Sequence, residues 1–564
     1  MDITVKIGGE AGQGIQTVGQ LLALTCHQAG LYLRGINDFE SRIRGGHSFF
    51  QLRLSDKPVN APHHHVHLLV AMDQKTHDLH REQVLPDGLT LINGEKAKNF
   101  GPVCPIPIFE LAREAGSLIT AGTASAGAAL ALLGAPFELF EKVIRRQFEG
   151  RGTTTTEQNL KAAKLGFKAV EGVEFAYAFK WAPDKPKGML IDGSQSIALG
   201  ALAGDCRFAA YYPMSPATSI MQHLVSYQDR FPLVVEQAED EIAAVNMIIG
   251  ASFAGIRAIT ATSGGGFCLM TEGVGLAGIT ETPIVIVNAQ RPGPATGLPT
   301  RTAQGDLHFV IRAAQDDFPR FVFAPGSPEE AFETTARALT LTEKYQTPAI
   351  ILVDQFFNDS LYLVGSRFPV PEEIERFLVD EDSLDYDKEY MRYSITESGI
   401  SPRVLPCMTK ALVMASGNEH REDGHISEFV NDRNNMVDKR TRKLTGMLSE
   451  MREPKAYHGE SKTLLIGWGS TDGIIREAVD LLRNDGINAG SLHFCDLWPF
   501  PSEAAYRALS NAERLIMIEQ NSTGQFAQLL RQETGLTSSG NILKYDGRPF
   551  YPIEIFTKAK EFLE

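Results

Sequence analysis

Apolar and polar positions alternate in blocks along residues 233–266, and the pattern predicts a strand, a helix and a second strand. A short apolar run at 233–235 precedes three consecutive acids, the last of which, Glu241, opens an apolar helical segment at 242–253. A second strand-like run follows at 257–262. Two strands joined by a crossover helix lie parallel in a sheet. This stretch therefore predicts a doubly wound parallel α/β sheet.

The same alternation recurs in three blocks separated by less regular stretches. We predict α/β domains at residues 1–182, 188–379 and 458–564, with a polar connecting segment at 380–457. A proline-containing stretch at 181–187 has the composition of a linker. A chain of 564 residues is too long for one hydrophobic core. The fold class expected is therefore multi-domain α/β.

Charge and composition then narrow the class of protein. A formal net charge of −15 disfavours nucleic acid as a partner. No apolar run approaches the ~20 residues of a membrane span, and the first residues predict a strand and a glycine turn rather than a secretion signal. We therefore expect a cytoplasmic protein that binds neither nucleic acid nor membrane.

Metal sites are not expected in this chain. The histidine-rich stretch from His63 to His67 follows a proline and has no acid or cysteine beside it, which favours a loop rim over a metal site. The cysteines form no CxxC pair, which argues against an iron–sulfur or zinc site, and a disulfide framework is not expected in so large a chain. The six are widely spaced: Cys26, Cys104, Cys206, Cys268, Cys407 and Cys495.

Glu241 is the first candidate for chemistry. Its neighbours Glu239 and Asp240 are explained as solvated acids that complement the helix dipole. Glu241 instead begins a segment that is apolar nearly all round, at the edge of the sheet where open α/β folds bind ligands. A buried carboxylate needs a hydrogen-bond donor or takes up a proton.

Two loops are expected at the same edge. Ser215 lies between two prolines in the loop 213–218, and Arg291 begins the proline-rich loop 291–300, which ends at Thr300. Each loop follows an apolar strand, so Ser215, Glu241, Arg291 and Thr300 are expected to converge. The planar fork of an arginine suits a substrate carboxylate.

Other motifs allow more than one interpretation. The glycine-rich turn at 8–14 joins a strand to a helix and could cradle a phosphate, but its GGxxGxG spacing differs from the dinucleotide motif. Arg42 and Arg44, in the stretch 41–48, indicate either a basic turn or a polyphosphate or docking surface. His420 and His425 are interpreted as loop residues, and the charged run 438–443 as a solvated helix face.

Several motifs resemble those of the 2-oxoacid:ferredoxin oxidoreductases. YPMSPAT, EDEIAAVNMIIGAS and QRPGPATGLPTRTAQGD are similar to the pyrimidine-binding domain of the α subunit. GGEAGQGIQTVGQLLA and RGGHS resemble the γ domain, here fused at the N-terminus, and residues 458–564 resemble the C-terminal domain of transketolase-like proteins. The QR-GP-TG-PT loop looks most like that of the 2-oxoglutarate enzymes.

The resemblance implies roles for individual residues. Glu241 would contact N1′ of thiamine diphosphate, with Pro213 and Met214 in the same cofactor site. The substrate would be held by Ser215, Arg291, Thr296 and Thr300. Pyruvate-type members usually have threonine in place of Ser215, which weighs against pyruvate.

The resemblance also implies partners. The Mg²⁺-diphosphate motif, GDG followed by asparagine, does not occur, and Glu422-Asp423-Gly424 before Asn434-Asn435 is its nearest approach. A β subunit would then supply the Mg²⁺-diphosphate site and a [4Fe-4S] cluster, in an α2β2 assembly. The reaction implied converts 2-oxoglutarate and coenzyme A to succinyl-CoA and CO₂, with electrons passed to ferredoxin, or runs in reverse.

Three alternatives stay open. The substrate could be pyruvate or a branched 2-oxoacid, although Arg301 or His308 could serve the second carboxylate of 2-oxoglutarate. A transketolase-like carboligase would need the missing diphosphate motif. A non-catalytic scaffold that binds a nucleotide or coenzyme A through the turn at 8–14 would be indifferent to Glu241.

Overall fold

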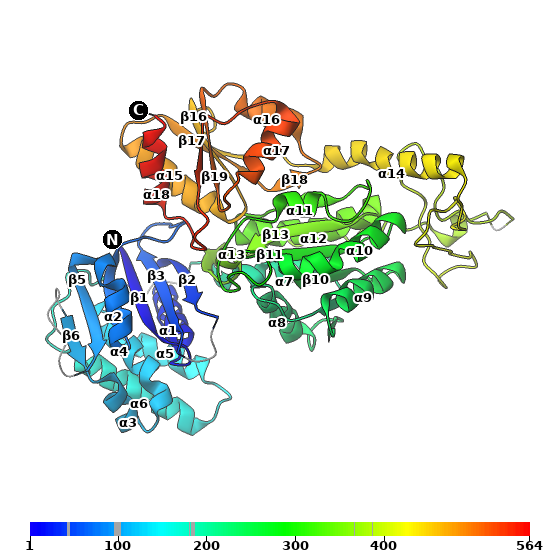
Figure 1. Ribbon diagram of the computed structural model, residues 1–564. Helices are drawn as coiled ribbons and strands as arrows, with labels where there is room; N and C mark the ends of the chain where they lie inside the picture. Colours follow the sequence, from blue (N-terminus) through cyan, green and yellow to red (C-terminus); the bar gives the residue numbers. More distant parts are fainter. Residues whose placement is uncertain are drawn as a thin grey trace. The chain divides into compact units, whose positions relative to one another are not determined.

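The chain folds into two compact units (Figure 1). The computed structural model describes residues 1–41, 45–94, 103–179, 181, 187–365, 367–385 and 387–563. Arg42 and Arg44 of the expected basic turn lie outside the described residues, as do 182–186 of the expected linker. The first unit comprises Met1–Ile191, Asp359–Arg367 and Tyr551–Ile553, and the second comprises Asp192–Asn358, Phe368–Phe550 and Glu554–Glu564.

The first unit contains an eight-stranded mixed sheet in the order β6-β5-β4-β1-β3-β2-β14-β7. Its strands are β1 (Asp2–Glu10), β2 (Tyr32–Phe39), β3 (His47–Ser55), β4 (Val66–Ala71), β5 (Val84–Asn93), β6 (Val103–Ile106), β7 (Met189–Asp192) and β14 (Leu361–Val364). Its helices are α1 (Ile15–Gln28), α2 (Gln74–His80), α3 (Ile108–Ala115), α4 (Ala121–Leu132), α5 (Phe137–Gln147) and α6 (Thr153–Ala169). A side chain at Gly127 or Gly166 would collide with the backbone of the opposite helix, so glycine lets α4 and α6 pack closely.

Two strands of this sheet come from the stretch expected to form the second domain. Strand β14 pairs antiparallel with β2, with Leu361 opposite Gly35 and Tyr362 opposite Arg34, and β7 lies beside β14 at the sheet edge. The structure therefore differs from the expected boundaries of 1–182 and 188–379. An apolar run identifies a strand, but an unpaired sheet edge elsewhere in the chain decides which sheet it joins.

The second unit begins with a seven-stranded sheet in the order β18-β12-β13-β11-β10-β8-β9. Strands β8 (Phe208–Tyr211), β9 (Val234–Gln237), β10 (Ala258–Thr262), β11 (Val285–Gln290), β12 (Phe321–Phe323) and β13 (Ala349–Asp354) are parallel, and β18 (Asp496–Trp498) adds antiparallel. The helices are α7 (Gly193–Ala203), α8 (Thr218–Tyr227), α9 (Glu241–Phe253), α10 (Gly264–Ile279), α11 (Leu307–Ile311), α12 (Pro328–Tyr345) and α13 (Gln355–Asn358). Strands β10 and β11 are buried along their whole length, as parallel strands covered on both faces require.

A five-stranded sheet forms the C-terminal part of the same unit, coloured orange to red in Figure 1. Its strands are β15 (Lys455–Tyr457), β16 (Thr463–Trp468), β17 (Ala489–Phe494), β19 (Arg514–Glu519) and β20 (Gly540–Leu543), and its helices are α15 (Asp472–Asn484), α16 (Ser502–Leu509), α17 (Gln525–Thr534) and α18 (Pro552–Glu561). One continuous hydrophobic core includes Ile350 of the larger sheet and Ile466 of this one.

The connecting segment ends in the long helix α14 (Val430–Glu450), with the irregular residues gathered around its N-terminal end (Figure 1). The expectation that 438–443 forms a solvated helix face is wrong. Lys439 and Lys443 are 0% and 2% exposed and lie 2.6 and 2.5 Å from the carboxylate oxygens of Glu281, which is itself fully buried. Arg440 pairs with Glu419 at 2.9 Å. The charges are buried because a partner 158 residues away in sequence neutralises Lys439.

Within the described residues, no helix combines the length and the apolar character that crossing a membrane demands.

Candidate active site at the carboxyl edge of the parallel sheet

The loops singled out in the sequence leave the same edge of the parallel sheet. Ser215 follows β8, Glu241 begins α9 after β9, and Arg291 immediately follows β11. Because β8, β9, β10 and β11 run in the same direction, all these residues come after the carboxyl ends of their strands.

Glu241 is buried at this edge, with 2% of its surface exposed. Its atom Oε1 receives no hydrogen bond from any described residue. A Cβ atom at Gly266 would stand 2.6 Å from this Oε1, so the glycine leaves room for the carboxylate beside α10. The neighbouring acids differ: Asp240 accepts the N–H of Ala243 at 2.7 Å and caps α9, and Glu239 is exposed. An unsatisfied buried carboxylate oxygen is costly, which fits a site where a ligand supplies the donor.

Arg291 and Ser215 are in direct contact. Arg291 Nη1 donates a hydrogen bond to the carbonyl oxygen of Ser215 at 2.7 Å. The arginine is half-buried, its Nε atom has no partner in the described part of the chain, and Ser215 is exposed. Burial lowers the pKa of Arg291, against the charges of Asp306 and Glu241. The Nε–H group of Arg291 is therefore available to donate a hydrogen bond to an anion, and the exposed Ser215 lies next to it.

Met214 and Pro213 border the same loop. Ser263, which precedes α10, donates its hydroxyl to Met214 Sδ at 2.7 Å. Met214 is half-buried and Pro213 is exposed. Met214 thus spans from the loop after β8 to the start of α10, the helix that Glu241 contacts.

The loop 291–300 places its two threonines differently. Its turn is closed by a hydrogen bond from Leu298 N to Pro292 O at 3.0 Å, and Thr296 is exposed on this turn. Thr300 is only 7% exposed. Beyond it, the N–H of Gln304 donates to Gln520 O at 2.7 Å, which anchors the end of the loop to the C-terminal sheet.

Asp306 belongs to this edge and was missed by the sequence analysis as a site residue. It is half-buried, and Asn288 Nδ2 donates to its Oδ2 atom at 3.1 Å. Burial raises its pKa to about 6, against the opposing effects of Asn288 and Arg291. A signal was present, because Asn288 and Gln290 are polar residues inside a strand that is otherwise apolar and fully buried.

The two candidates for a second carboxylate lie against the C-terminal part of the unit. A Cβ atom at Gly547 would meet Arg301 Cβ at 3.0 Å. His308 lines a pocket of about 600 Å³ together with Trp498 and Gln532.

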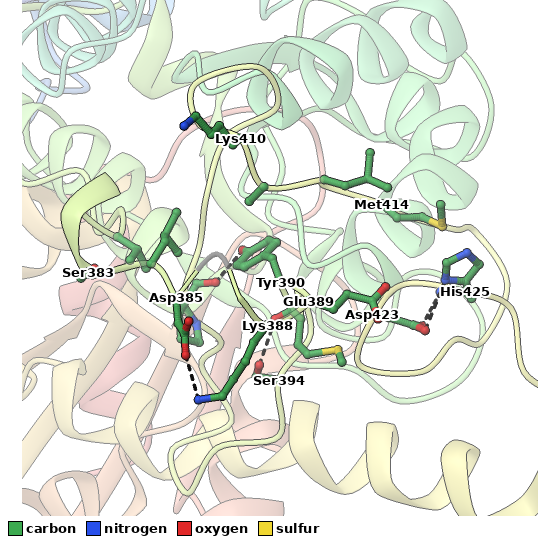
Figure 2. Close-up of a pocket in the computed structure, with 16 residues that line it drawn as sticks. Ser383, Asp385, Lys388, Glu389, Tyr390, Ser394, Lys410, Met414, Asp423 and His425 are labelled. Atoms are coloured by element: carbon green, nitrogen blue, oxygen red, sulfur yellow. Dashed lines mark hydrogen bonds and ion pairs between the residues drawn. The ribbon is translucent and has the colours of Figure 1, made fainter.

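A separate pocket of about 740 Å³ lies within the connecting segment (Figure 2). Asp423 and His425, 3.3 Å apart, lie at one end of the view, and Asp385 and Lys388, 2.8 Å apart, lie toward the other. Its lining includes none of the residues described at the sheet edge. His420 does not line it, because its ring is buried 4.1 Å from the ring of Tyr393.

In the first unit, the turn at 8–14 is held by a hydrogen bond from Ala11 N to Gly46 O at 2.8 Å. His67 Nδ1 accepts the N–H of Thr4 at 3.0 Å, and its ring packs 4.6 Å from that of Tyr177. These contacts give His67 a structural role. No group of three or more potential metal-binding side chains occurs among the described residues.

Family models match the chain in three segments. Residues 199–439 match "Pyruvate flavodoxin/ferredoxin oxidoreductase, thiamine diP-bdg", 4–169 match "Pyruvate ferredoxin/flavodoxin oxidoreductase", and 461–552 match "Pyruvate:ferredoxin oxidoreductase core domain II". Ser215, Glu241, Arg291 and Asp306 all fall in the segment that matches a thiamine diphosphate-binding domain.

Relatives are similar over the whole length. The α subunit of a 2-oxoacid:ferredoxin oxidoreductase from Sulfolobus sp is 33% identical over 616 residues, which cover 98% of this chain and 96% of that protein. The 2-oxoglutarate synthase subunit KorA of Methanothermobacter thermautotrophicus is 30% identical, over 65% of this chain and 96% of its own. The structure of a 2-oxoglutarate:ferredoxin oxidoreductase from Magnetococcus marinus, with 2-oxoglutarate, coenzyme A and succinyl-CoA bound, superposes with a TM-score of 0.91 at 29% identity and covers both chains completely.

The full-length similarity, the three matched segments and the multi-domain α/β fold agree with one another. The chain therefore belongs to the family of 2-oxoacid:ferredoxin oxidoreductase α subunits.

Proposed function

We propose that this chain is the α subunit of a 2-oxoglutarate:ferredoxin oxidoreductase, which converts 2-oxoglutarate and coenzyme A to succinyl-CoA and CO₂ or catalyses the reverse. The observation that carries the proposal is the Oε1 atom of Glu241, which is buried, has no hydrogen-bond partner in the part of the chain that the structure describes, and lies beside the loops of Arg291 and Ser215. The similarity to KorA and to the Magnetococcus marinus enzyme supports 2-oxoglutarate over pyruvate.

The site would hold the pyrimidine half of thiamine diphosphate. Glu241 would face N1′, and Met214 and Pro213 would border the ring from the loop after β8. The cofactor supplies the electron sink that allows a 2-oxoacid to lose CO₂. Glu241 fits this position because its Oε1 has no donor among the described residues and because glycine at position 266 leaves room for the carboxylate.

The chain's own residues have distinct tasks in this proposal. Glu241 would share a proton with N1′ and act there as a general acid–base group. Arg291 orients the substrate carboxylate with its two-pronged guanidinium, and the Ser215 hydroxyl adds a hydrogen bond. Thr296 and Thr300 would border the same substrate from the loop 291–300.

The remaining parts of the reaction are assigned to partners. A β subunit would supply the Mg²⁺-diphosphate site and the [4Fe-4S] cluster, because the GDG motif and closely spaced cysteines are missing from this sequence. An α2β2 assembly would deliver electrons to ferredoxin. Alone, the chain is expected to be inactive.

The test is coenzyme-A-dependent viologen reduction by the complex of this chain with its β subunit. Activity should be higher with 2-oxoglutarate than with pyruvate or a branched 2-oxoacid. Glu241→Gln should lower kcat at least about 100-fold, the lower range of general acid–base contributions. Glu239→Gln is the matched control, because this exposed acid two residues away should leave kcat unchanged.

A complex that contains thiamine diphosphate and its cluster but oxidises no 2-oxoacid would overturn the proposal. Activity with pyruvate alone would overturn 2-oxoglutarate as the substrate, but it would still support a 2-oxoacid:ferredoxin oxidoreductase. Full activity of the Glu241→Gln variant would show that Glu241 has no catalytic role.

A further inference from the structure

Asp306 is anchored to the strand that leads into Arg291. Asn288 Nδ2 donates to Asp306 Oδ2 at 3.1 Å, and the backbone N–H of Asp306 donates to Gln290 Oε1 at 3.0 Å. Asn288 and Gln290 both belong to β11 and are almost fully buried. The carboxyl group is thus fixed to the end of the strand that is immediately followed by Arg291.

The first turn of α10 separates Asp306 from Glu241. A side chain at Gly264 would collide with Asp306 Oδ2, and one at Gly266 would meet Glu241 Oε1 at 2.6 Å. Arg291 experiences the charge of both carboxylates, each of which opposes the lowering of its pKa by burial. The charges of two carboxyl groups at the start of α10 therefore act on the arginine proposed to bind the substrate, and the proposed mechanism uses only one of these groups.

The groups around Asp306 define its charge. It is hydrogen-bonded to the neutral side-chain amides of Asn288 and Gln290 on β11. It also interacts electrostatically with the cation of Arg291 in the following loop and with the thiol of Cys268 on α10. Burial raises the pKa of Asp306 to about 6, despite Asn288 and Arg291. The carboxyl group therefore changes charge just below neutral pH.

We propose that Asp306 is a positioning residue that acts through Arg291, and that its carboxylate competes with the carboxylate of the 2-oxoacid for the charge of the guanidinium. This inference rests on the proposed function. Such competition weakens binding of the substrate carboxylate before it is lost as CO₂. Because the carboxylate loses its charge in the transition state, restraint of ground-state binding favours turnover.

The proposal predicts an unusual combination of kinetic changes. Asp306→Asn retains the backbone N–H to Gln290 and the size of the side chain. The KM for 2-oxoglutarate should fall by up to about tenfold, which corresponds to a coupling of one pKa unit. The kcat should fall with it, because ground-state binding tightens more than transition-state binding. In the wild type the KM should rise from pH 5.5 to 7.5, and in the variant it should stay level.

A second readout needs neither cofactor nor activity. Cys268 is exposed, and its pKa is raised first by partial burial and then by the charge of Asp306. In the full chain with Cys407→Ser, which removes the other exposed thiol, Asp306→Asn should speed iodoacetamide labelling of Cys268 several-fold near pH 8. Mass spectrometry would locate the label.

Asp354→Asn is the matched control, because burial raises the pKa of Asp354 to about 6 as well, but this carboxyl group accepts hydrogen bonds from Ser470 and from the N–H of Phe357. It should leave the pH dependence of the KM and the labelling of Cys268 unchanged. An Asp306→Asn complex with the wild-type KM profile, or with a raised KM, overturns the inference, as does unchanged labelling. Failure of the wild-type complex to oxidise any 2-oxoacid is a different result and overturns the proposed function instead.

Discussion

Replacing Glu281 by glutamine should loosen the attachment of helix α14 to the second unit. Glu281 is fully buried, and its two carboxylate oxygens accept hydrogen bonds from Lys439 Nζ at 2.6 and 2.8 Å. Lys443 Nζ lies 2.5 Å from Oε2 of the same carboxylate. Arg392 adds a third positive charge nearby. Glutamine keeps the volume but leaves two buried ammonium groups without their counter-ion.

The structure sets the size of the effect. Removing one member of a buried ion pair costs about 3–5 kcal/mol, whereas an exposed pair is worth about 0–1 kcal/mol. Burial by itself raises the pKa of Glu281, but Lys443, Lys439 and Arg392 outweigh burial and hold that pKa below its ordinary value of 4.5. Its stabilisation is therefore complete above pH 4.5 and is lost as the pH falls through the lowered pKa.

The cost of Glu281→Gln should also depend on pH below neutrality. Burial lowers the pKa of Lys443 to about 7, against the attraction of Glu281. Without Glu281 the pKa of Lys443 falls further, so the variant sheds this proton at a lower pH than the wild type, and the difference in stability should shrink as the pH rises toward 7. Lys443→Met in the Glu281→Gln background should recover part of the loss for the same reason.

Hydrogen exchange of α14, followed by mass spectrometry at pH 6.5, measures the effect locally, which suits a chain of several domains. A loss of about 3 kcal/mol speeds exchange of its most protected amides roughly 100-fold. Asp385→Asn is the control, because Asp385 pairs with Lys388 at 2.8 Å on the surface, where the two side chains are 53% and 80% exposed. Exchange in Glu281→Gln no faster than in the control would refute the reasoning.

Two further substitutions test the sheet edge and its surroundings. Gly266→Ala should abolish binding of thiamine diphosphate to the complex, because the added Cβ would collide with Thr262 and lie 2.6 Å from Glu241 Oε1. Calorimetry measures the binding. The control is Gly265→Ala in the same turn, whose Cβ would meet nothing closer than 3.7 Å, so the complex should bind the cofactor normally. Asp354→Asn should change the pH dependence of stability. Burial raises the pKa of Asp354 from 3.8 to about 6, so the contribution of this group to stability is greatest below pH 4 and falls by about 3 kcal/mol as the pH rises through 6. Thermal unfolding at pH 4 and pH 7 checks this, and an equal pH dependence in both proteins would contradict it.

The elements around the site follow from local sequence. The apolar strand before Arg291, the acids before α9 and the glycines that begin α10 specify a parallel sheet with loops at its carboxyl edge. The sequence motifs of these loops also indicated the family, because binding and catalytic residues lie mainly on loops, whereas residues of the scaffold mainly serve packing. The roles of individual site residues remain proposals that the experiments above test.

Other features depend on partners far away in the chain. The charged run at Lys439 and Lys443 has the pattern of a solvated face, but the buried carboxylate of Glu281 pairs with both ammonium groups and stabilises their burial. Strand β14 has an ordinary strand pattern, and the free edge of β2 decides that it joins the first sheet.

The sequence by itself determined the α/β class, the family and the loops that carry the candidate site, because periodicity and motif are local properties of the chain. The tertiary structure alone decided that Glu241 Oε1 lacks a donor among the described residues, that Arg291 binds the backbone of Ser215, and that Asp306 lies between the end of β11 and the start of α10. Burial, charge and hydrogen bonding depend on which distant segments meet, and the order of residues does not state this.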